Sequence, residues 1–243
     1  MWVAMANSPY LPLNTTLYAE GAVHNEFASY WGEVVNQADV ALLQWPLGLS
    51  LDPSLARRDL DFWASRTNFS YMFTGDAAYA VAYLALGLRS AADSQLAVAF
   101  SHIHTAGFMV WSELAAQGGC LHFLTGAGGF LQTMLFGYGS LRVPRPGVWR
   151  VLPTGPVLPP MGVTSVVLRG IHLQGAVANM AYNETHVCVS LQAAQKTGIP
   201  VLVLVPGGGG TSQRIGFSDV CLRLPVPGGF EVRAQAPSSS QAA

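Results

Sequence analysis

The segment FLTGAGGFLQ (Phe123–Gln132) places a threonine and three glycines at the start of an apolar run, which closes with FGYG at residues 136–139. Free N–H groups at a helix start attract anions and sugar oxygens, and glycines let a ligand approach the backbone closely. The segment therefore predicts one wall of a pocket for a polar ligand. Thr125 is placed to cap the helix. A capped helix entry that packs tightly against the core is the other interpretation.

The chain changes character near residue 145. Before it, apolar residues recur at helical spacing, which predicts helices at 22–43, 54–64, 76–88, 91–104 and 127–138. A proline-rich stretch from Pro144 to Pro160 then indicates an irregular connection. We expect a partial helical domain at 1–145, a small antiparallel β-sandwich at 146–236 and a disordered tail at 237–243. The expected strands are 163–168, 171–181, 186–191, 201–205, 220–224 and 230–234.

The chain is unusually poor in charge. Charged residues make up 10% of its 243 residues and hydrophobic residues 51%, whereas an average globular domain is about 25% charged. This composition indicates a segment of a larger protein, with apolar patches exposed when the segment stands alone. The net charge is −1 without a basic cluster, so nothing indicates a nucleic-acid partner. The longest near-apolar run, 77–88, is shorter than the about 20 residues of a membrane span.

The cysteines, Cys120, Cys188 and Cys221, are unevenly spaced and form no paired motif. We therefore expect buried, reduced cysteines rather than a disulfide framework or a zinc site. Sequons for N-glycosylation matter only if the chain enters a secretory compartment. Such sequons begin at Asn14, Asn68 and Asn183.

Three upstream segments strengthen the functional interpretation: HNEF at 24–27, YWGE at 30–33 and NQADVALLQWPLG at 36–48. Together with FLTGAGGFLQ they resemble glycoside hydrolase family sixty-five. That family holds maltose, kojibiose and trehalose phosphorylases, acid trehalases, and glucosidases that trim glucose from glucosyl-galactosyl-hydroxylysine of collagen. The match is densest over about residues 15–145 and favours the last branch. The resemblance implies an (α/α)6 toroid followed by a small β domain, of which this chain supplies only the C-terminal part.

An inverting glycosidase needs one carboxyl group to protonate the leaving oxygen and another, about 6.5–9.5 Å away, to activate water. The resemblance implies that the acid is a glutamate in a Gly-Pro-Asp-Glu-Tyr-like motif upstream of the matched region. No such motif occurs in this chain. We therefore expect the chain to lack its general acid and to be inactive alone.

The resemblance also implies a carboxylate that activates water. Glu113 lies shortly before the glycine-rich segment and is our candidate general base; a solvated glutamate at a helix end is the alternative. Asp76 is the rival, although a carboxylate at a helix start also stabilises the helix dipole. The phosphorylases hold phosphate with a hydroxyl-rich loop. The corresponding stretch here, residues 70–76, lacks their Ser-Ser-x-Ser pattern, which favours water over phosphate.

Asn36 and Gln37 fall where the phosphorylases have a Lys-Gln pair that contacts sugar hydroxyls. The resemblance implies the same amide hydrogen bonds for Gln37 and the loss of a cation at Asn36. Helix capping is the alternative for both amides. Trp31 would form an apolar platform for a sugar ring, or else belong to the core. The other candidate substrate contacts are Thr125, Gly126, Gly128 and Gly129.

These residues lead to one prediction and two alternatives. The chain is predicted to be a fragment of an inverting glycosidase that releases glucose from an α-glucosyl disaccharide, with a carbohydrate as its partner. A disaccharide phosphorylase of the same fold and an inactive sugar-binding or interaction fragment are the alternatives. No metal, organic cofactor or membrane is implied. The compartment stays open, because a targeting segment would precede the part of the protein present here.

Overall fold

The structure, a computed structural model, describes residues 12–49, 51–68, 75–104, 109–115, 118–194 and 201–235. The chain divides into two compact units. The first unit comprises Met1–Leu86 and Ser90–Phe130, and the second comprises Gly87–Arg89 and Leu131–Ala243. Among the described residues, no helix combines the length and apolar character needed to cross a membrane. The predicted tail at 237–243 lies outside the described residues.

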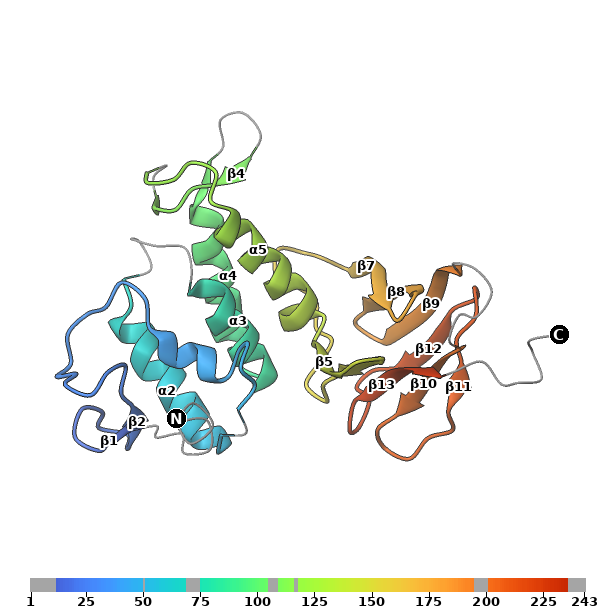
Figure 1. The fold of residues 1–243 in the computed structure, drawn as a ribbon, viewed down its shortest axis with the longest axis horizontal. Coiled ribbons are helices and arrows are strands. Elements are labelled where there is room, and N and C mark those ends of the chain that lie inside the picture. The colour runs from blue at the N-terminus through green and yellow to red at the C-terminus, as the bar shows by residue number, and fades with distance from the viewer. Residues whose placement is uncertain are drawn as a thin grey trace, which may run out of the picture. The chain divides into compact units, whose positions relative to one another are not determined.

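The first unit is built mainly from helices, labelled in Figure 1: α2 (Pro53–Arg66), α3 (Asp76–Ala85), α4 (Arg89–Ser101) and α5 (Leu124–Gln132). The start of α2 is set by Asp52, whose carboxylate accepts hydrogen bonds from the backbone of Ser54 and Leu55 at 3.0 and 3.1 Å. Every residue of α3 except the last is buried, which explains its nearly uniform apolar sequence. The four helices confirm the predictions made from helical spacing beyond residue 50.

The predicted helix at 22–43 is wrong. This region contains the short paired strands β1 (Leu13–Asn14) and β2 (Val23–His24), irregular chain, and a 3-10 helix, η1 (Asp39–Leu43). Tertiary hydrogen bonds replace the helical ones: the backbone N–H of His24 donates to the Asp59 carboxylate at 2.8 Å. The apolar spacing of this region reflects burial against α2 rather than helical geometry.

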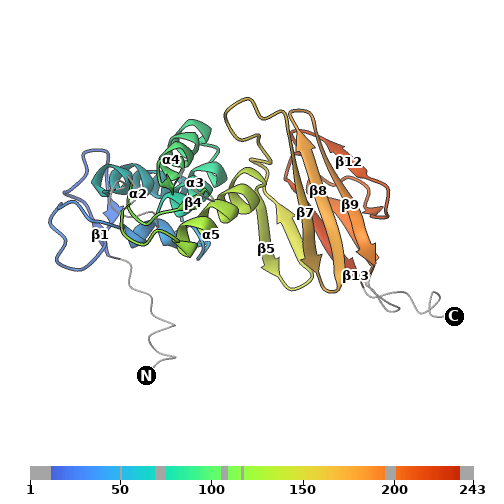
Figure 2. The ribbon, with the colours of Figure 1, turned by 90° about the horizontal axis from the view of Figure 1, so that it is seen from above.

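The second unit contains two antiparallel sheets (Figure 2), and these share one hydrophobic core. Buried side chains from both sheets, among them Trp149, Met180 and Leu202, form that core, so the predicted antiparallel sandwich is confirmed. A π-helical turn, η3 (Thr133–Tyr138), precedes the first of these strands. The five-stranded sheet has the order β11 (Gln213–Arg214), β10 (Val201–Pro206), β13 (Phe230–Gln235), β6 (Val148–Val151) and β5 (Leu141–Arg145). The four-stranded sheet has the order β12 (Val220–Arg223), β9 (His186–Ala194), β8 (Ala176–Asn183) and β7 (Ser165–Leu173).

Two strand predictions need correction. The first part of the proline-rich stretch is not an irregular connection, because Pro144 lies in β5 and the stretch also contains β6. Strand β5 is an edge strand, where the missing N–H of proline is tolerated. The predicted strand at 171–181 is two strands joined by a tight turn. Gln174 and Gly175 in that turn have φ angles of 49° and 88°, which suit a two-residue hairpin. The toroid and the domain limits at 145 and 236 stay predictions.

The expectation of buried, reduced cysteines is also wrong. Cys188 of β9 and Cys221 of β12 are opposite each other in the sheet and form a disulfide. Cys120 is free and exposed. The pairing was not visible in the sequence, because the register of β9 against β12, not sequence spacing, brings the two sulfurs together.

Candidate functional site

The glycine-rich segment forms the body of α5. The helix begins at Leu124, so Thr125 lies inside its first turn and not at the capping position. Thr125 is exposed, and Leu124 exposes 83% of its surface. Leu47 exposes 63% of its surface, and the predicted apolar patches stay a prediction.

The three glycines of α5 have different surroundings. Gly126 is buried. A Cβ atom on Gly129 would lie 2.9 Å from the Cβ of Ala77, so Gly129 allows α5 to pack closely on α3. A Cβ on Gly128 would meet no atom of the described residues within 4 Å, apart from the backbone of α5 itself. Tight packing therefore explains Gly129, whereas Gly128 leaves open space beside the helix.

Glu113 lies in the segment that leads into α5. The preceding strand β4 (Val110–Trp111) pairs with β3 (Ile103–His104), and the backbone N–H of Phe123 donates to the Trp111 carbonyl at 2.8 Å. The Trp111 ring lies 4.9 Å from the Phe130 ring of α5, between centroids. These contacts hold the Glu113 segment against the glycine-rich helix.

The Glu113 carboxylate is itself positioned by the backbone. Its Oε2 accepts a hydrogen bond from the N–H of Cys120 at 3.0 Å, and its own N–H donates to the Cys120 carbonyl at 2.9 Å. The side chain is half-buried. A half-buried carboxylate with one N–H donor keeps lone pairs available to accept a proton from water.

Asn36 and Gln37 are exposed and lie in the loop before η1. The Gln37 amide donates to the Asp39 carboxylate at 2.7 Å. Glu26 caps η1 from a distant part of the chain, accepting from the N–H groups of Asp39 and Val40 at 2.7 and 3.2 Å. Burial raises the pKa of Glu26, and these two hydrogen bonds oppose that increase.

The adjacent aromatic residues Tyr30 and Trp31 have opposite environments. Tyr30 is 4% exposed, and its ring centroid lies 4.6 Å from that of Trp63. Trp31 exposes 74% of its surface, so it is not a core residue. Of the two interpretations offered for Trp31, the core one is wrong.

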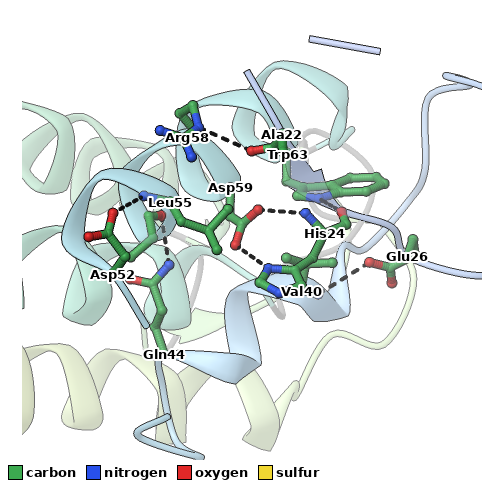
Figure 3. A network of polar contacts seen from close by, with 11 residues as sticks. Ala22, His24, Glu26, Val40, Gln44, Asp52, Leu55, Arg58, Asp59 and Trp63 are labelled. Atoms are coloured by element: carbon green, nitrogen blue, oxygen red, sulfur yellow. Dashed lines mark hydrogen bonds and ion pairs between the residues drawn. The ribbon is translucent and has the colours of Figure 1, made fainter. Parts of the chain in front are cut away.

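A buried polar network anchors this region to α2, as Figure 3 shows. Asp59 accepts from the His24 backbone N–H at 2.8 Å, and its Oδ2 lies 2.7 Å from His24 Nδ1. The indole of Trp63 donates to the His24 carbonyl at 3.0 Å. Sequence reasoning missed Asp59. The available signal was an acidic residue on the face of α2 that also carries Leu60 and Trp63.

Asp76 begins α3 and is 1% exposed. Neither of its carboxylate oxygens has a hydrogen-bond partner in the described part of the chain. Burial raises its pKa from 3.8 to about 7. The next residue, Ala77, is the one that Gly129 packs against, so this carboxyl lies close to the contact between α3 and α5.

The structure therefore brings Glu113 and α5 together through hydrogen bonds and ring contacts. Asn36 and Gln37 lie beside η1, which contacts α3, and α3 in turn contacts α5 through Gly129. A cavity of about 640 Å³ lies in the second unit, lined partly by residues 153–163, and none of the predicted sugar-binding residues lines it. Within the described ranges, no group of three His, Cys, Asp or Glu side chains is arranged to hold a metal ion.

Comparison with known proteins gives partial matches. No family model matches the chain. The protein-glucosylgalactosylhydroxylysine glucosidase of Danio rerio is 32% identical over 211 residues, which covers 86% of this chain and 31% of the relative. The protein of the same name from Mus musculus is 33% identical over 202 residues, which covers 83% of this chain and 28% of the relative. The kojibiose hydrolase of Mucilaginibacter mallensis is 36% identical over 136 residues, which covers 55% of this chain and 20% of the relative.

A solved structure from the human microbiome, assigned as a kojibiose phosphorylase, matches with a TM-score of 0.55. It is 12% identical, and the match covers 78% of this chain and 25% of that one, so it bears on the fold alone. The chain spans less than a third of the length of the curated relatives described above. The sequence matches support a family like glycoside hydrolase family sixty-five, at modest identity and partial coverage.

Proposed function

We propose that this chain is the C-terminal part of an inverting glycosidase that releases glucose from an α-glucosyl disaccharide, with glucosyl-galactosyl-hydroxylysine of collagen as the substrate. The observation that carries the proposal is the similarity to two proteins named glucosylgalactosylhydroxylysine glucosidase over 83% and 86% of this chain. Matches of that extent include most of the stretch from Asn36 to Gly129. Most of the segment that holds the candidate residues therefore lies inside the region of similarity.

In this proposal, Glu113 is the general base that takes a proton from the attacking water. Its carboxylate is held by the Cys120 N–H directly before α5, so the base and the glycine-rich helix belong to one local assembly. The general acid would come from a part of the protein that is not in this chain. The 243-residue chain alone is then expected to release no glucose, because only one of the two required carboxyl groups is present.

In this proposal, the glucose is bound by residues beside η1 together with residues of α5. Asn36 and Gln37 offer exposed amides beside η1, and the exposed indole of Trp31 offers an apolar face for a sugar ring. The remaining candidate contacts, Thr125, Gly126, Gly128 and Gly129, belong to α5. The open space at Gly128 supports a close approach of ligand to backbone there, whereas the Ala77 contact makes Gly129 a packing residue that shapes the wall.

The test is glucose release from glucosyl-galactosyl-hydroxylysine by the full-length protein that contains this chain. Replacing the base, Glu113→Gln, should lower kcat by about 10²–10⁴-fold with little change in KM. Asp76→Asn is the matched comparison, because Asp76 is the rival carboxyl and lies on the neighbouring helix. If Asp76→Asn abolishes turnover and Glu113→Gln does not, the base is Asp76.

The competing reaction is phosphorolysis. Turnover by the full-length protein should proceed without inorganic phosphate, and the first product detected by NMR should be the β-anomer of glucose, since the mechanism inverts. A requirement for phosphate, with glucose 1-phosphate as the product, would rule out the hydrolase. Residues 70–74, which include most of the stretch corresponding to the phosphate loop, lie outside the described residues.

A further inference from the structure

Two of the three sequons adopt the same local structure. In Asn183-Glu184-Thr185, the Asn183 Oδ1 accepts hydrogen bonds from the Thr185 N–H at 2.8 Å, the Thr185 hydroxyl at 3.0 Å and the His186 N–H at 2.9 Å. In Asn14-Thr15-Thr16, the Asn14 Oδ1 accepts in the same way from Thr16 and Leu17. The three distances there are 2.9, 2.9 and 3.1 Å.

This turn leaves the asparagine Nδ2, the atom to which an N-linked glycan is attached, available. Both asparagines use the amide oxygen for all the hydrogen bonds described for their side chains, so Nδ2 is not engaged by the described residues in either case. Asn183 ends β8, and residues 183–186 are all exposed. Asn14 ends β1 and is half-buried, beside the exposed Thr16. Both sites therefore lie in surface turns, with the threonine hydroxyl against the asparagine amide.

An independent feature points to the compartment in which such sequons are used. Cys188 and Cys221 form a disulfide across two strands of the four-stranded sheet. Structural disulfides persist in oxidising compartments and are rare in the cytosol. The disulfide and the two sequon turns are thus separate signs of the same cellular environment.

We propose that Asn183 and Asn14 are N-glycosylated in the secretory pathway. In the transfer, Nδ2 forms a bond to the anomeric carbon of a lipid-pyrophosphate-linked oligosaccharide. The bond from that carbon to the pyrophosphate oxygen breaks, and lipid pyrophosphate and one amide proton are released. The sites do not depend on the proposed glucosidase activity. The proposal does not include Asn68, because residues 69 and 70 of its sequon lie outside the described residues.

The experiment uses the full-length protein expressed from its own coding sequence in eukaryotic cells. Free thiols are alkylated, the glycans are removed by peptide-N-glycosidase in heavy-oxygen water, and the peptides are read by mass spectrometry. We expect heavy-oxygen-labelled aspartate at positions 183 and 14, and no alkylation of Cys188 or Cys221 before reduction. Recovery of both asparagines unmodified, or alkylation of both cysteines without reduction, would overturn the proposal.

A matched pair of variants tests the role of the hydroxyl at the exposed site. Thr185→Val should remove the glycan from Asn183 and leave the one on Asn14, whereas Thr185→Ser, which keeps the hydroxyl, should retain both. These changes are at an exposed turn, so folding is expected to survive, and the retained disulfide reports it. A glycan that persists at Asn183 in Thr185→Val would contradict the assignment.

Discussion

Asp76→Asn should remove a pH-dependent loss of stability that the buried Asp76 carboxyl causes. The Asp76 carboxyl is buried without a hydrogen-bond partner in the described residues, and its pKa is raised from 3.8 to about 7. The folded chain therefore keeps a proton that the unfolded chain releases. Stability is greatest below pH 3.8 and decreases as the pH rises through about 7. The difference between the two pKa values, at about 1.4 kcal/mol per pKa unit, corresponds to roughly 4 kcal/mol.

The amide that replaces the carboxyl in Asp76→Asn cannot ionise, so the variant should lose this decrease. The unfolding free energy of Asp76→Asn minus that of the parent chain should therefore increase by roughly 4 kcal/mol from pH 4 to pH 8. The comparison of two pH values matters, because any fixed cost of burying the amide NH₂ cancels between them. Urea titrations of the 243-residue chain, followed by circular dichroism at several pH values, measure this quantity.

The exposed residue Asp219 offers a control, because Asp219→Asn removes a carboxylate from the surface. If the parent and Asp76→Asn keep the same difference in stability at pH 4 and pH 8, Asp76 is not held protonated by burial, and the reasoning is refuted. The same outcome would make Asp76 an ionised carboxylate at neutral pH and would strengthen its candidacy as the general base.

Three further predictions concern a buried hydrogen-bonded pair, helix packing and the disulfide. Asp59→Ala leaves the buried His24 ring and backbone N–H without their partner; it should lower the unfolding free energy by about 3–5 kcal/mol in urea titrations. Gly129→Ala should lower the unfolding free energy by about 1–3 kcal/mol through overpacking. The control Gly128→Ala should raise the unfolding free energy by up to about 1 kcal/mol through helix propensity. Equal effects of the two substitutions would contradict the packing role of Gly129. Cys188→Ser removes a crosslink with a sequence separation of 33 and should lower stability by about 3–4 kcal/mol, and reducing agent should then have no further effect on Tm.

Local sequence patterns predicted the elements whose structure depends on local interactions. The helices α2 to α5 follow from apolar spacing over more than two turns, and Asp52-Pro53 marks the start of α2 by capping chemistry. The strands β9 and β10 follow from short β-branched runs between turn residues, whereas the turn between β7 and β8 was missed. The same patterns failed at 22–43. There the carboxylates of Asp59, in α2, and of Glu26 accept hydrogen bonds from backbone N–H groups in place of helical carbonyls.

From the sequence by itself came the two-part character of the chain, the shortage of charge, the resemblance to a glycosidase family and the candidate catalytic and sugar-binding residues. These depend on residue type and spacing, which a sequence displays. Only the tertiary structure decided that Gly129 packs on Ala77 while Gly128 does not, that Asp76 is buried without a partner among the described residues, and that Cys188 meets Cys221. Each of those depends on which residues from distant segments become neighbours, because burial, close packing and strand register are properties of the assembled chain.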